Sequence, residues 1–343
     1  MPSTQELDAQ APSAPLQTER VHLIDVGPLF ENDAPARERV STEIRRACLE
    51  TGFFYIHNTC ISDDLIGATL EQMQRFFSLH DDDPRKRAAH SSLGPGGTGW
   101  GPMFCEPAYQ PGTVAHLESF DLSPPMEWVG NQEQAAKLGI YPNLWPNLPG
   151  FREVVDTYYL AARQLGQALF EAFADAMGLP REFFVTRATR HAPSTMRLLN
   201  YPGQRRVSDR SNVGIAAHTD FECFTIMYQT APGLELTDNA GRWWQAPANI
   251  GQYTVILGDM LERLSNGQWP ATGHRVGITP WQRFSIILFN ALDGDCPVAP
   301  LPQFVEAGRV PEYPATTQGG HIEEQIRRAE GFRDPETRSY TED

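Results

Sequence analysis

The side chains best suited to chemistry in this chain are His218 and Asp220, which one residue separates. Side chains alternate between the two faces of an extended strand, so these two should point the same way and bind one ion. His274 follows a loop containing Gly and Pro, where a new strand should begin. Two imidazoles and a carboxylate form the facial triad that holds a redox-active iron and leaves positions open for dioxygen and a co-substrate. We predict that these three residues bind iron.

Arg283 and Ser285 repeat the two-residue spacing on the strand after His274. Their guanidinium and hydroxyl should face the same interior as the triad, where they can bind a carboxylate. An isolated H-x-D sequence is more often a hydrogen-bonded structural pair than a metal site. The ordered set of H-x-D, a later His and R-x-S, each in a strand-like run, instead favours the metal site.

The composition is that of a folded protein with an acidic surface. At 343 residues and 41% hydrophobic content, the chain can form one large domain or one core with a helical annex. The net charge of −15 argues against a nucleic-acid partner, because a phosphate backbone requires clustered Lys and Arg. No run of 18 apolar residues is present, and residues 1–20 lack the basic and apolar regions of a secretion signal. We expect no membrane contact, no secretion, and a disordered tail over residues 1–20.

The five cysteines are scattered and include no C-x-x-C pair, which favours the reducing cytoplasm. Cys223 lies closest in sequence to the triad. If one strand continued through His218 and Asp220, residues 222 and 224 would face inward and Cys223 outward, unless the chain bends at Phe221. A thiolate beside an iron that activates dioxygen would also be oxidised. We predict that Cys223 is structural and is not a metal ligand.

The first half of the chain should support the site. We expect residues 21–190 to form an α/β and helical support region, because apolar residues recur at helical spacing in several stretches that end at Gly or Pro. Strands are predicted at 21–25 and 53–56, and helices at 37–51, 62–79 and 151–177. Residues 91–150 lack a regular pattern, and such long structured loops often carry function. Pocket candidates here, which compete with ordinary loop packing, are Met103, Cys105, Tyr109, His116, Glu118 and Phe120.

The second half changes to short strands separated by Pro and Gly. This pattern over residues 191–317 predicts a jelly-roll double sheet whose mouth can hold a metal. Its strands are expected at 196–201, 214–220, 224–229, 234–237, 243–246, 254–257, 274–278 and 283–290. Residues 318–343 should form a C-terminal helix and tail. That helix either covers the mouth or is an exposed terminal helix with no such role.

Several further stretches occur in an order typical of one enzyme family. They lie at residues 21–25, 47–58, 118–121, 143–146, 217–220, 232–236, 258–259, 264–267, 274–276 and 283–285. On these residues the chain resembles the isopenicillin N synthase-like family of non-haem iron(II)/2-oxoglutarate-dependent dioxygenases, from residue 21 to about residue 328. The resemblance implies a mainly β fold with flanking helices, built on a distorted double-stranded β-helix, or jelly roll.

The resemblance also implies roles for individual residues. It makes His218, Asp220 and His274 the ligands of iron(II), through which they are catalytic. It makes Arg283 and Ser285 the partners of the distal carboxylate of 2-oxoglutarate. Tyr201, in Asn200-Tyr201-Pro202, is similar to a family tyrosine that reaches the same carboxylate, although many members have two tyrosines between Asn and Pro.

The expected activity is that of an iron(II)- and 2-oxoglutarate-dependent dioxygenase. Such an enzyme oxidises a small organic substrate with dioxygen by hydroxylation, desaturation or ring closure, through a ferryl intermediate and with release of succinate and CO2. One alternative is an isopenicillin N synthase-like oxidase without 2-oxoglutarate, in which Arg283 and Ser285 bind the substrate's own carboxylate. The R-x-S pair suits both, because a guanidinium recognises any carboxylate. A remote alternative is a non-enzymatic metal-binding jelly roll. The identity of the substrate and the oligomeric partners lie beyond the sequence.

Overall fold

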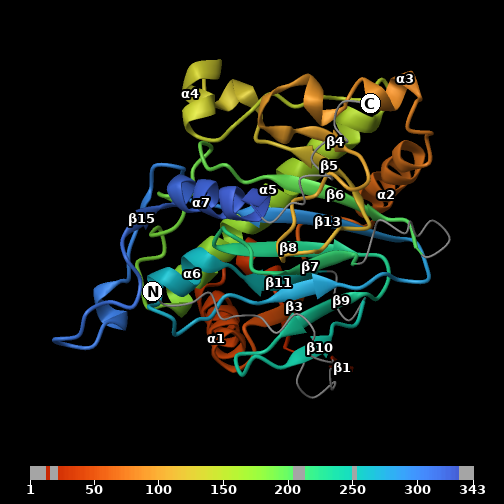
Figure 1. The fold of residues 1–343 in the computed structure, drawn as a ribbon. Helices are drawn as coiled ribbons and strands as arrows, with labels where there is room; N and C mark the ends of the chain where they lie inside the picture. The colour runs from red at the N-terminus through yellow and green to blue at the C-terminus, as the bar shows by residue number, and fades with distance from the viewer. Residues whose placement is uncertain (1–12, 16–21, 204–212, 249–252, 332–343) are drawn as a thin grey trace.

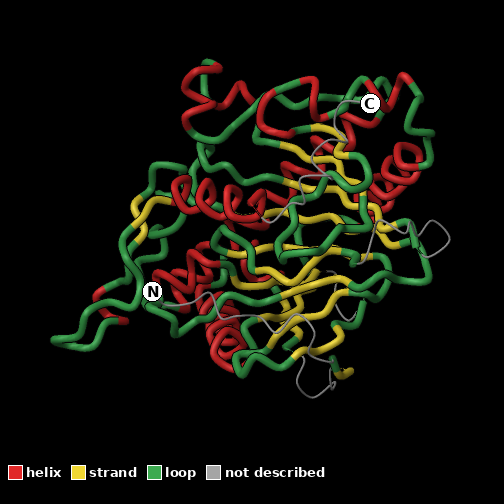
Figure 2. The backbone as a smooth tube through the Cα atoms, viewed as in Figure 1, coloured by secondary structure: helices red, strands yellow, loops and turns green. Residues whose placement is uncertain are grey.

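The computed structural model describes residues 13–15, 22–203, 213–248 and 253–331. Two β-sheets face each other, and helices cover the outer face of the larger one (Figures 1 and 2). The mainly β jelly roll expected from the sequence is therefore confirmed. Within the described residues, no helix is long and apolar enough to cross a membrane.

The larger sheet has eight strands and forms the floor of the site. Its neighbours are antiparallel except for β2 and β3, which run parallel. The order across the sheet is β2 (Leu23–Asp25), β3 (Phe53–His57), β11 (Tyr253–Leu257), β8 (Phe224–Gln229), β13 (Arg283–Asn290), β6 (Met196–Tyr201), β5 (Glu118–Leu122) and β4 (Gly99–Gly101). Because four of these strands precede residue 190, the support region and the expected core share one sheet.

The smaller sheet has five strands and faces the larger one. Its order is β1 (Ala14–Pro15), β10 (Trp243–Gln245), β9 (Leu234–Thr237), β12 (His274–Val276) and β7 (Ile215–His218). Strand β1 pairs with β10, and Ser13 donates a hydrogen bond to Glu235, so this piece of the tail expected to be disordered is paired with the core. The rest of residues 1–20 lies outside the described residues. A short ladder, β14 (Pro297–Val298) with β15 (Thr316–Thr317), stands apart.

The long helices begin where side chains cap their free N–H groups. Asp33 and Ser62 accept hydrogen bonds from the first turns of α1 (Ala34–Glu50) and α2 (Asp63–Phe77). The longest helix, α5 (Phe151–Ala176), begins after Gly150, whose φ of 81° suits glycine. The shorter α-helices are α3 (Pro84–Arg87), α4 (Gln132–Lys137), α6 (Asp259–Leu264) and α7 (Gln318–Gly331), and 3-10 turns lie at Gly27–Phe30, Ser91–Leu93, Pro95–Gly97, Met126–Trp128 and Pro302–Phe304.

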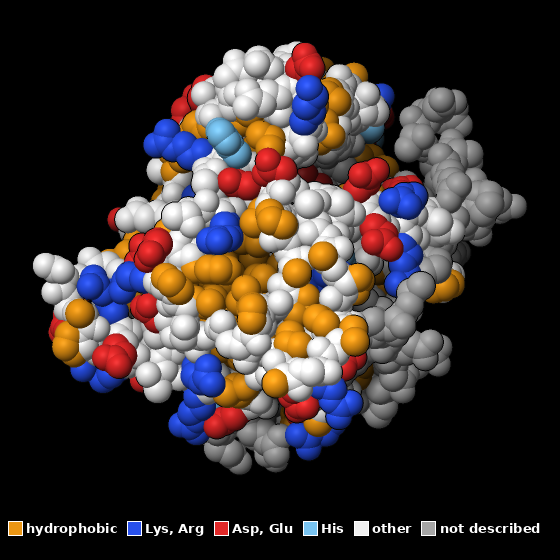
Figure 3. All heavy atoms as spheres, turned by 90° about the vertical axis from the view of Figure 1, so that its left-hand side faces the viewer, with side chains coloured by type: hydrophobic (Ala, Val, Ile, Leu, Met, Phe, Trp, Pro, Cys, Tyr) orange, Lys and Arg blue, Asp and Glu red, His pale blue; other side chains and the backbone are white. Residues whose placement is uncertain are grey.

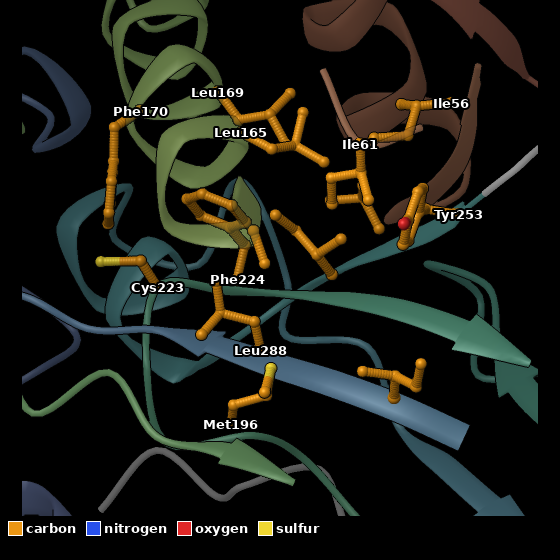
Figure 4. Packing of buried hydrophobic residues seen from close by; sticks show 14 of the residues in the cluster. Ile56, Ile61, Leu165, Leu169, Phe170, Met196, Cys223, Phe224, Tyr253 and Leu288 are labelled. Carbon is orange, nitrogen blue, oxygen red and sulfur yellow. The ribbon is translucent and has the colours of Figure 1, made fainter. Parts of the chain in front are cut away.

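Strict alternation along the central strands separates the packed core from the site. On β6, Met196 and Leu198 join the large apolar cluster under α5, while Leu199 and Tyr201 join the cluster between the sheets. Figure 4 shows Leu165 and Phe170 of α5 packed over the sheet residue Phe224. One face of the sheet thus holds the fold together, which leaves the other face available for chemistry.

Candidate metal and co-substrate site

The structure brings His218, Asp220 and His274 together between the two sheets. His218 ends β7, His274 begins β12, and the two are directly paired across the antiparallel ladder. The Oδ1 atom of Asp220 lies 3.8 Å from Nε2 of His218 and 3.5 Å from Nε2 of His274. One ligand atom from each of the three residues lies within 4.8 Å of the other two. In the described part of the chain, no other group of three or more His, Cys, Asp or Glu residues converges in this way.

Both imidazoles are held with Nε2 directed at the shared point. Nδ1 of His218 lies 2.8 Å from the Ala216 carbonyl, and Nδ1 of His274 lies 3.2 Å from the Thr272 carbonyl. Because a carbonyl only accepts, Nδ1 carries the proton and Nε2 offers its lone pair, as metal-binding histidines require. Burial, with a contribution from His274, holds the pKa of His218 well below its usual value, which keeps that ring neutral.

Asp220 is held by a neighbouring hydroxyl. Its Oδ2 accepts a very short hydrogen bond from Thr225 on β8, which leaves Oδ1 facing the two imidazoles. Burial raises the pKa of Asp220, because removing the carboxylate from water disfavours its charged form. A divalent cation would remove that penalty. Two neutral imidazoles and one carboxylate, buried and convergent, fit a facial iron(II) site.

The chain departs from the expected strand after His218. β7 ends there, and residues 219–223 form a loop, with bends at 221–223, before β8, so Asp220 reaches the triad from a loop and not from a continuous strand. Glu222 lines the cavity, as strand alternation predicts. The prediction that residue 224 also faces the site is wrong, because Phe224 packs in the apolar core. Cys223 lies beside Phe224 in that core (Figure 4) and is not part of the group that converges with the triad.

Arg283 is buried and has no carboxylate partner among the described residues. Its Nη2 donates to Gln229 Oε1 at 2.8 Å and its Nε donates to the Ala231 carbonyl at 3.2 Å. Nη1 is buried without a hydrogen bond. The side chain is 1% exposed, and burial lowers the pKa of the guanidinium. Burying a charge without a partner costs several kcal/mol of folding free energy, so a bound anion would stabilise this guanidinium.

Ser285 and Tyr201 lie beside that guanidinium. Ser285 Oγ is buried without a hydrogen-bond partner, one inward position along β13 from Arg283. Tyr201 is paired with Arg283 across β6 and β13, and its ring centroid lies 4.8 Å from the guanidinium carbon. Burial raises the pKa of Tyr201, so its hydroxyl keeps its proton as a donor. Arg283 Nη1 and Ser285 Oγ are therefore neighbouring buried donors without a partner, and a carboxylate could accept hydrogen bonds from both.

One cavity of about 1100 Å³ connects both groups. Tyr109, from the long loop, stacks on His218 with 4.2 Å between ring centroids. Of the other pocket candidates in that loop, none lines the cavity: Met103, Cys105, His116, Glu118 and Phe120. Glu118 instead forms a buried ion pair with Lys86. Glu106, Asp121 and Arg197 also line the cavity, and sequence patterns did not single them out.

The C-terminal helix α7 forms part of the cavity wall, which favours the covering role over a free terminal helix. Ile322, Glu323, Ile326 and Arg327 line the cavity. The start of the helix is fixed by His321, whose Nε2 lies 2.7 Å from Asp259. On the face that carries α4 and α7, hydrophobic side chains gather near the centre between charged groups (Figure 3).

Comparisons with known proteins agree with this geometry. Residues 21–148 match the family described as non-haem dioxygenase in morphine synthesis N-terminal, and residues 193–291 match the 2OG-Fe(II) oxygenase superfamily. The chain is 29% identical over 334 residues to the 2-oxoglutarate-Fe(II) type oxidoreductase hxnY of Emericella nidulans, covering 93% of this chain and 90% of the relative. It is 30% identical over 318 residues to the proline hydroxylase buaE of Petromyces alliaceus, covering 87% and 94%.

Solved structures share the fold. A full-length Neurospora crassa protein in complex with alpha-KG superposes with a TM-score of 0.76 at 21% identity, over 94% of this chain and 100% of that one. The same Neurospora protein with alpha-KG and thymine gives a TM-score of 0.73 at 20% identity, over 91% and 96%. The arrangement of sheets and helices is therefore that of proteins solved with 2-oxoglutarate.

Proposed function

The chain belongs to the 2OG-Fe(II) oxygenase superfamily, and on that premise we propose which of its residues hold each reactant. It is a 2-oxoglutarate-dependent dioxygenase that uses iron(II), 2-oxoglutarate and dioxygen to oxidise a small molecule. The family assignment favours this activity over the two alternatives, an oxidase without 2-oxoglutarate and a metal-binding protein without activity.

His218, Asp220 and His274 hold iron(II) in this proposal. It is supported by their convergence, by the Nδ1 contacts that aim each Nε2, and by the Thr225 hydrogen bond that presents one oxygen of Asp220. Three ligands on one side of an octahedral ion leave the other positions for co-substrate and dioxygen.

Arg283, Ser285 and Tyr201 hold the distal carboxylate of 2-oxoglutarate. The observation that carries this assignment is the pair of buried donors without partners, Nη1 of Arg283 and Oγ of Ser285, in the same cavity as the triad. Gln229 and the Ala231 carbonyl fix the guanidinium plane, so its free edge is presented before the ligand arrives. The carboxylate would neutralise a charge that the described protein groups leave uncompensated.

Iron(II) held by His218, Asp220 and His274 would supply the redox chemistry that links decarboxylation of 2-oxoglutarate to succinate and CO2 with oxidation of the substrate by dioxygen. The chain's own residues set where this occurs. Leu199, Met227 and Ile287 form an apolar wall that excludes water. Tyr109 covers one face of the His218 ring, which restricts the approach of the substrate to the open part of the cavity.

We also propose that the enzyme acts in a reducing compartment, the cytoplasm, and on a free small molecule. None of the five cysteines forms a disulfide, which is typical of proteins kept under reducing conditions. The net charge of −15 opposes binding to nucleic acids and to anionic membrane surfaces.

Anaerobic titration of the iron(II) protein with 2-oxoglutarate tests the assignment of co-substrate and metal together. We expect a visible metal-to-ligand charge-transfer band that saturates at one 2-oxoglutarate per iron. Glutarate, which lacks the keto group, is the control and should give no band while competing for Arg283. A protein that retains iron but develops no band, and forms no succinate in air, would overturn the proposal.

A further inference from the structure

His218 lies at the edge of the smaller sheet. Its strand, β7, is paired with β12 on one side and is the outermost strand of that sheet among the described residues. The loop that joins β4 to β5 covers the open edge. Ala115 of this loop is paired with Val213 just before β7, and Nε2 of Gln110 donates to the Ala217 carbonyl at 3.0 Å. The loop therefore occupies the place that a neighbouring strand would take.

Tyr109 of the same loop packs flat against His218. The ring centroids are 4.2 Å apart and the ring planes differ by 12°, so the phenol covers one face of the imidazole. His274, in contrast, lies on a strand with a neighbour on each side, β7 and β9. The two histidines of the triad are thus supported differently, His274 from within the sheet and His218 partly by the loop.

The stacked phenol limits a motion that the hydrogen bond of His218 leaves free. Nδ1 of His218 bonds to the Ala216 carbonyl, which selects the tautomer and fixes one point of the ring. Because a carbonyl oxygen accepts hydrogen bonds over a broad range of directions, the ring can still tilt about that point. A flat contact over one face opposes the tilt. The direction in which Nε2 presents its lone pair therefore depends on Tyr109.

Tyr109 is itself anchored to the larger sheet. Its hydroxyl donates to Oε1 of Glu106 at 3.0 Å. The two oxygens of Glu106 accept hydrogen bonds from Nη1 and Nη2 of Arg197 on β6, at 2.8 and 2.6 Å. The side chains of this bidentate ion pair are only 3% and 14% exposed, which gives the pair a defined geometry. Because Gln110 binds β7, the loop is fixed to both sheets, on either side of Tyr109 in the chain.

We propose that Tyr109 is a positioning residue for the metal ligand His218, and that Glu106 and Arg197 act through it. All four side chains line the same cavity, so a loop that shapes the substrate pocket also orients the iron site. This inference rests on the proposed function and adds a role for residues outside the ligand triad.

Cobalt(II) in place of iron(II) reports on each histidine separately. Its unpaired electrons shift the Nδ1 proton of a metal-bound histidine away from the other signals of a proton NMR spectrum, and this signal is lost in D2O. Contacts with Ala216 and Thr272, whose carbonyls lie next to these two protons, assign the signals. We expect Tyr109→Leu to move the His218 signal and to leave the His274 signal in place. An unmoved His218 signal, or equal shifts of both signals, would overturn the inference.

Metal affinity provides a second measurement. In competition with a chelator, Tyr109→Leu should bind cobalt(II) about fivefold more weakly, as the loss of one aromatic contact predicts. Tyr109→Phe keeps the ring and should change the affinity less than about twofold. Tyr313→Leu is the matched control, because Tyr313 also donates to a glutamate, Glu262, at 2.6 Å but does not line the cavity. Equal losses of affinity in Tyr109→Leu and Tyr313→Leu would indicate a general effect on the fold and would also overturn the inference.

The outcome is separable from that of the proposed function. If neither Nδ1 signal appears in the wild-type cobalt(II) protein, the triad does not bind the metal and the proposed function fails. If both signals appear and Tyr109→Leu leaves that of His218 in place, only the role of Tyr109 fails. Should Tyr109→Leu not fold, Glu106→Gln decides, because it keeps the size of the side chain and disrupts the paired bonds to Arg197. It should move the same signal by a smaller amount, and an unmoved signal would overturn the inference.

Discussion

The two histidines of the triad are oriented by the backbone just before each of them. Each Nδ1 contacts the carbonyl two residues earlier in the chain, Ala216 for His218 and Thr272 for His274. The backbone that leads into each histidine therefore also selects its tautomer. Asp220 lacks such a local partner and depends on Thr225 from the next strand. The side chains of the proposed ligand set are therefore oriented without a bound metal.

Replacing His274 with Ala should abolish stoichiometric iron binding. Only two ligands would remain, and they cannot hold an octahedral ion with open positions. Iron content after anaerobic reconstitution and desalting measures this. His321→Ala, which removes a buried histidine outside the triad, serves as the control and should retain iron. Wild-type iron affinity together with turnover in His274→Ala would contradict the assignment.

Replacing Arg283 with Lys should weaken 2-oxoglutarate binding and leave iron binding unchanged. Lysine keeps the charge but loses the planar fork and the contacts with Gln229 and Ala231 that aim it. Ser285→Ala should have the smaller effect, about 1 kcal/mol for one hydrogen bond, which is about fivefold in affinity. Titration of the charge-transfer band measures both. Equal 2-oxoglutarate affinity in wild type and Arg283→Lys would rule out this role.

At the scale of elements, β13 connects the two halves of the site. It lies between β6 and β8, so Arg283 faces Tyr201 on one side, and Ser285 is paired with Gln229 on the other. Helix α7 is attached at its start, where Gln318 bonds to the backbone of Leu292 and Phe221. Further along the helix, Ile326 lines the cavity and is 47% exposed, whereas Ala329 is buried.

His321→Ala should loosen α7. The substitution removes the contact with buried Asp259 and leaves that carboxylate without its partner. We expect faster amide hydrogen exchange over residues 318–331, measured by mass spectrometry, with iron affinity close to that of the wild type. Glu324→Ala, an exposed position on the same helix, is the matched control. Unchanged exchange in His321→Ala would show that other contacts secure the helix.

At the scale of the whole molecule, the site lies between two sheets that the ligands connect. The triad comes from the smaller sheet and its following loop, whereas Arg283 and Ser285 come from the larger sheet. 2-Oxoglutarate would contact both. Ligands that bind only the folded state stabilise it by mass action.

Iron(II) and 2-oxoglutarate together should therefore raise the melting temperature of the anaerobic protein by several degrees. At a hundredfold excess over the dissociation constant, one ligand contributes about 2.7 kcal/mol. Scanning calorimetry with and without a chelator measures the shift. His274→Ala should show little of it, and an equal shift in that variant would indicate that stabilisation does not come from the triad.

The sequence by itself determined the chemistry and the order of the elements. His218, Asp220, His274, Arg283 and Ser285 were identified by residue type and two-residue spacing, because strand alternation is a local property of the backbone. The same local signals predicted the jelly roll and the long helices to within a few residues of their ends, where caps and turns compete. The fold, and the residues proposed for the site, could be predicted from patterns that neighbouring residues carry.

The tertiary structure decided what depends on distant segments. The Glu106, Asp121 and Arg197 cluster joins a loop and two strands, and no spacing rule brings them together. The bend at residues 219–223 changed the face on which Phe224 lies, because packing under α5 outweighed strand parity. Contacts of α7 with the cavity also required the folded chain. These features depend on contacts between distant segments, whereas the residues proposed to bind iron could be recognised from their local spacing.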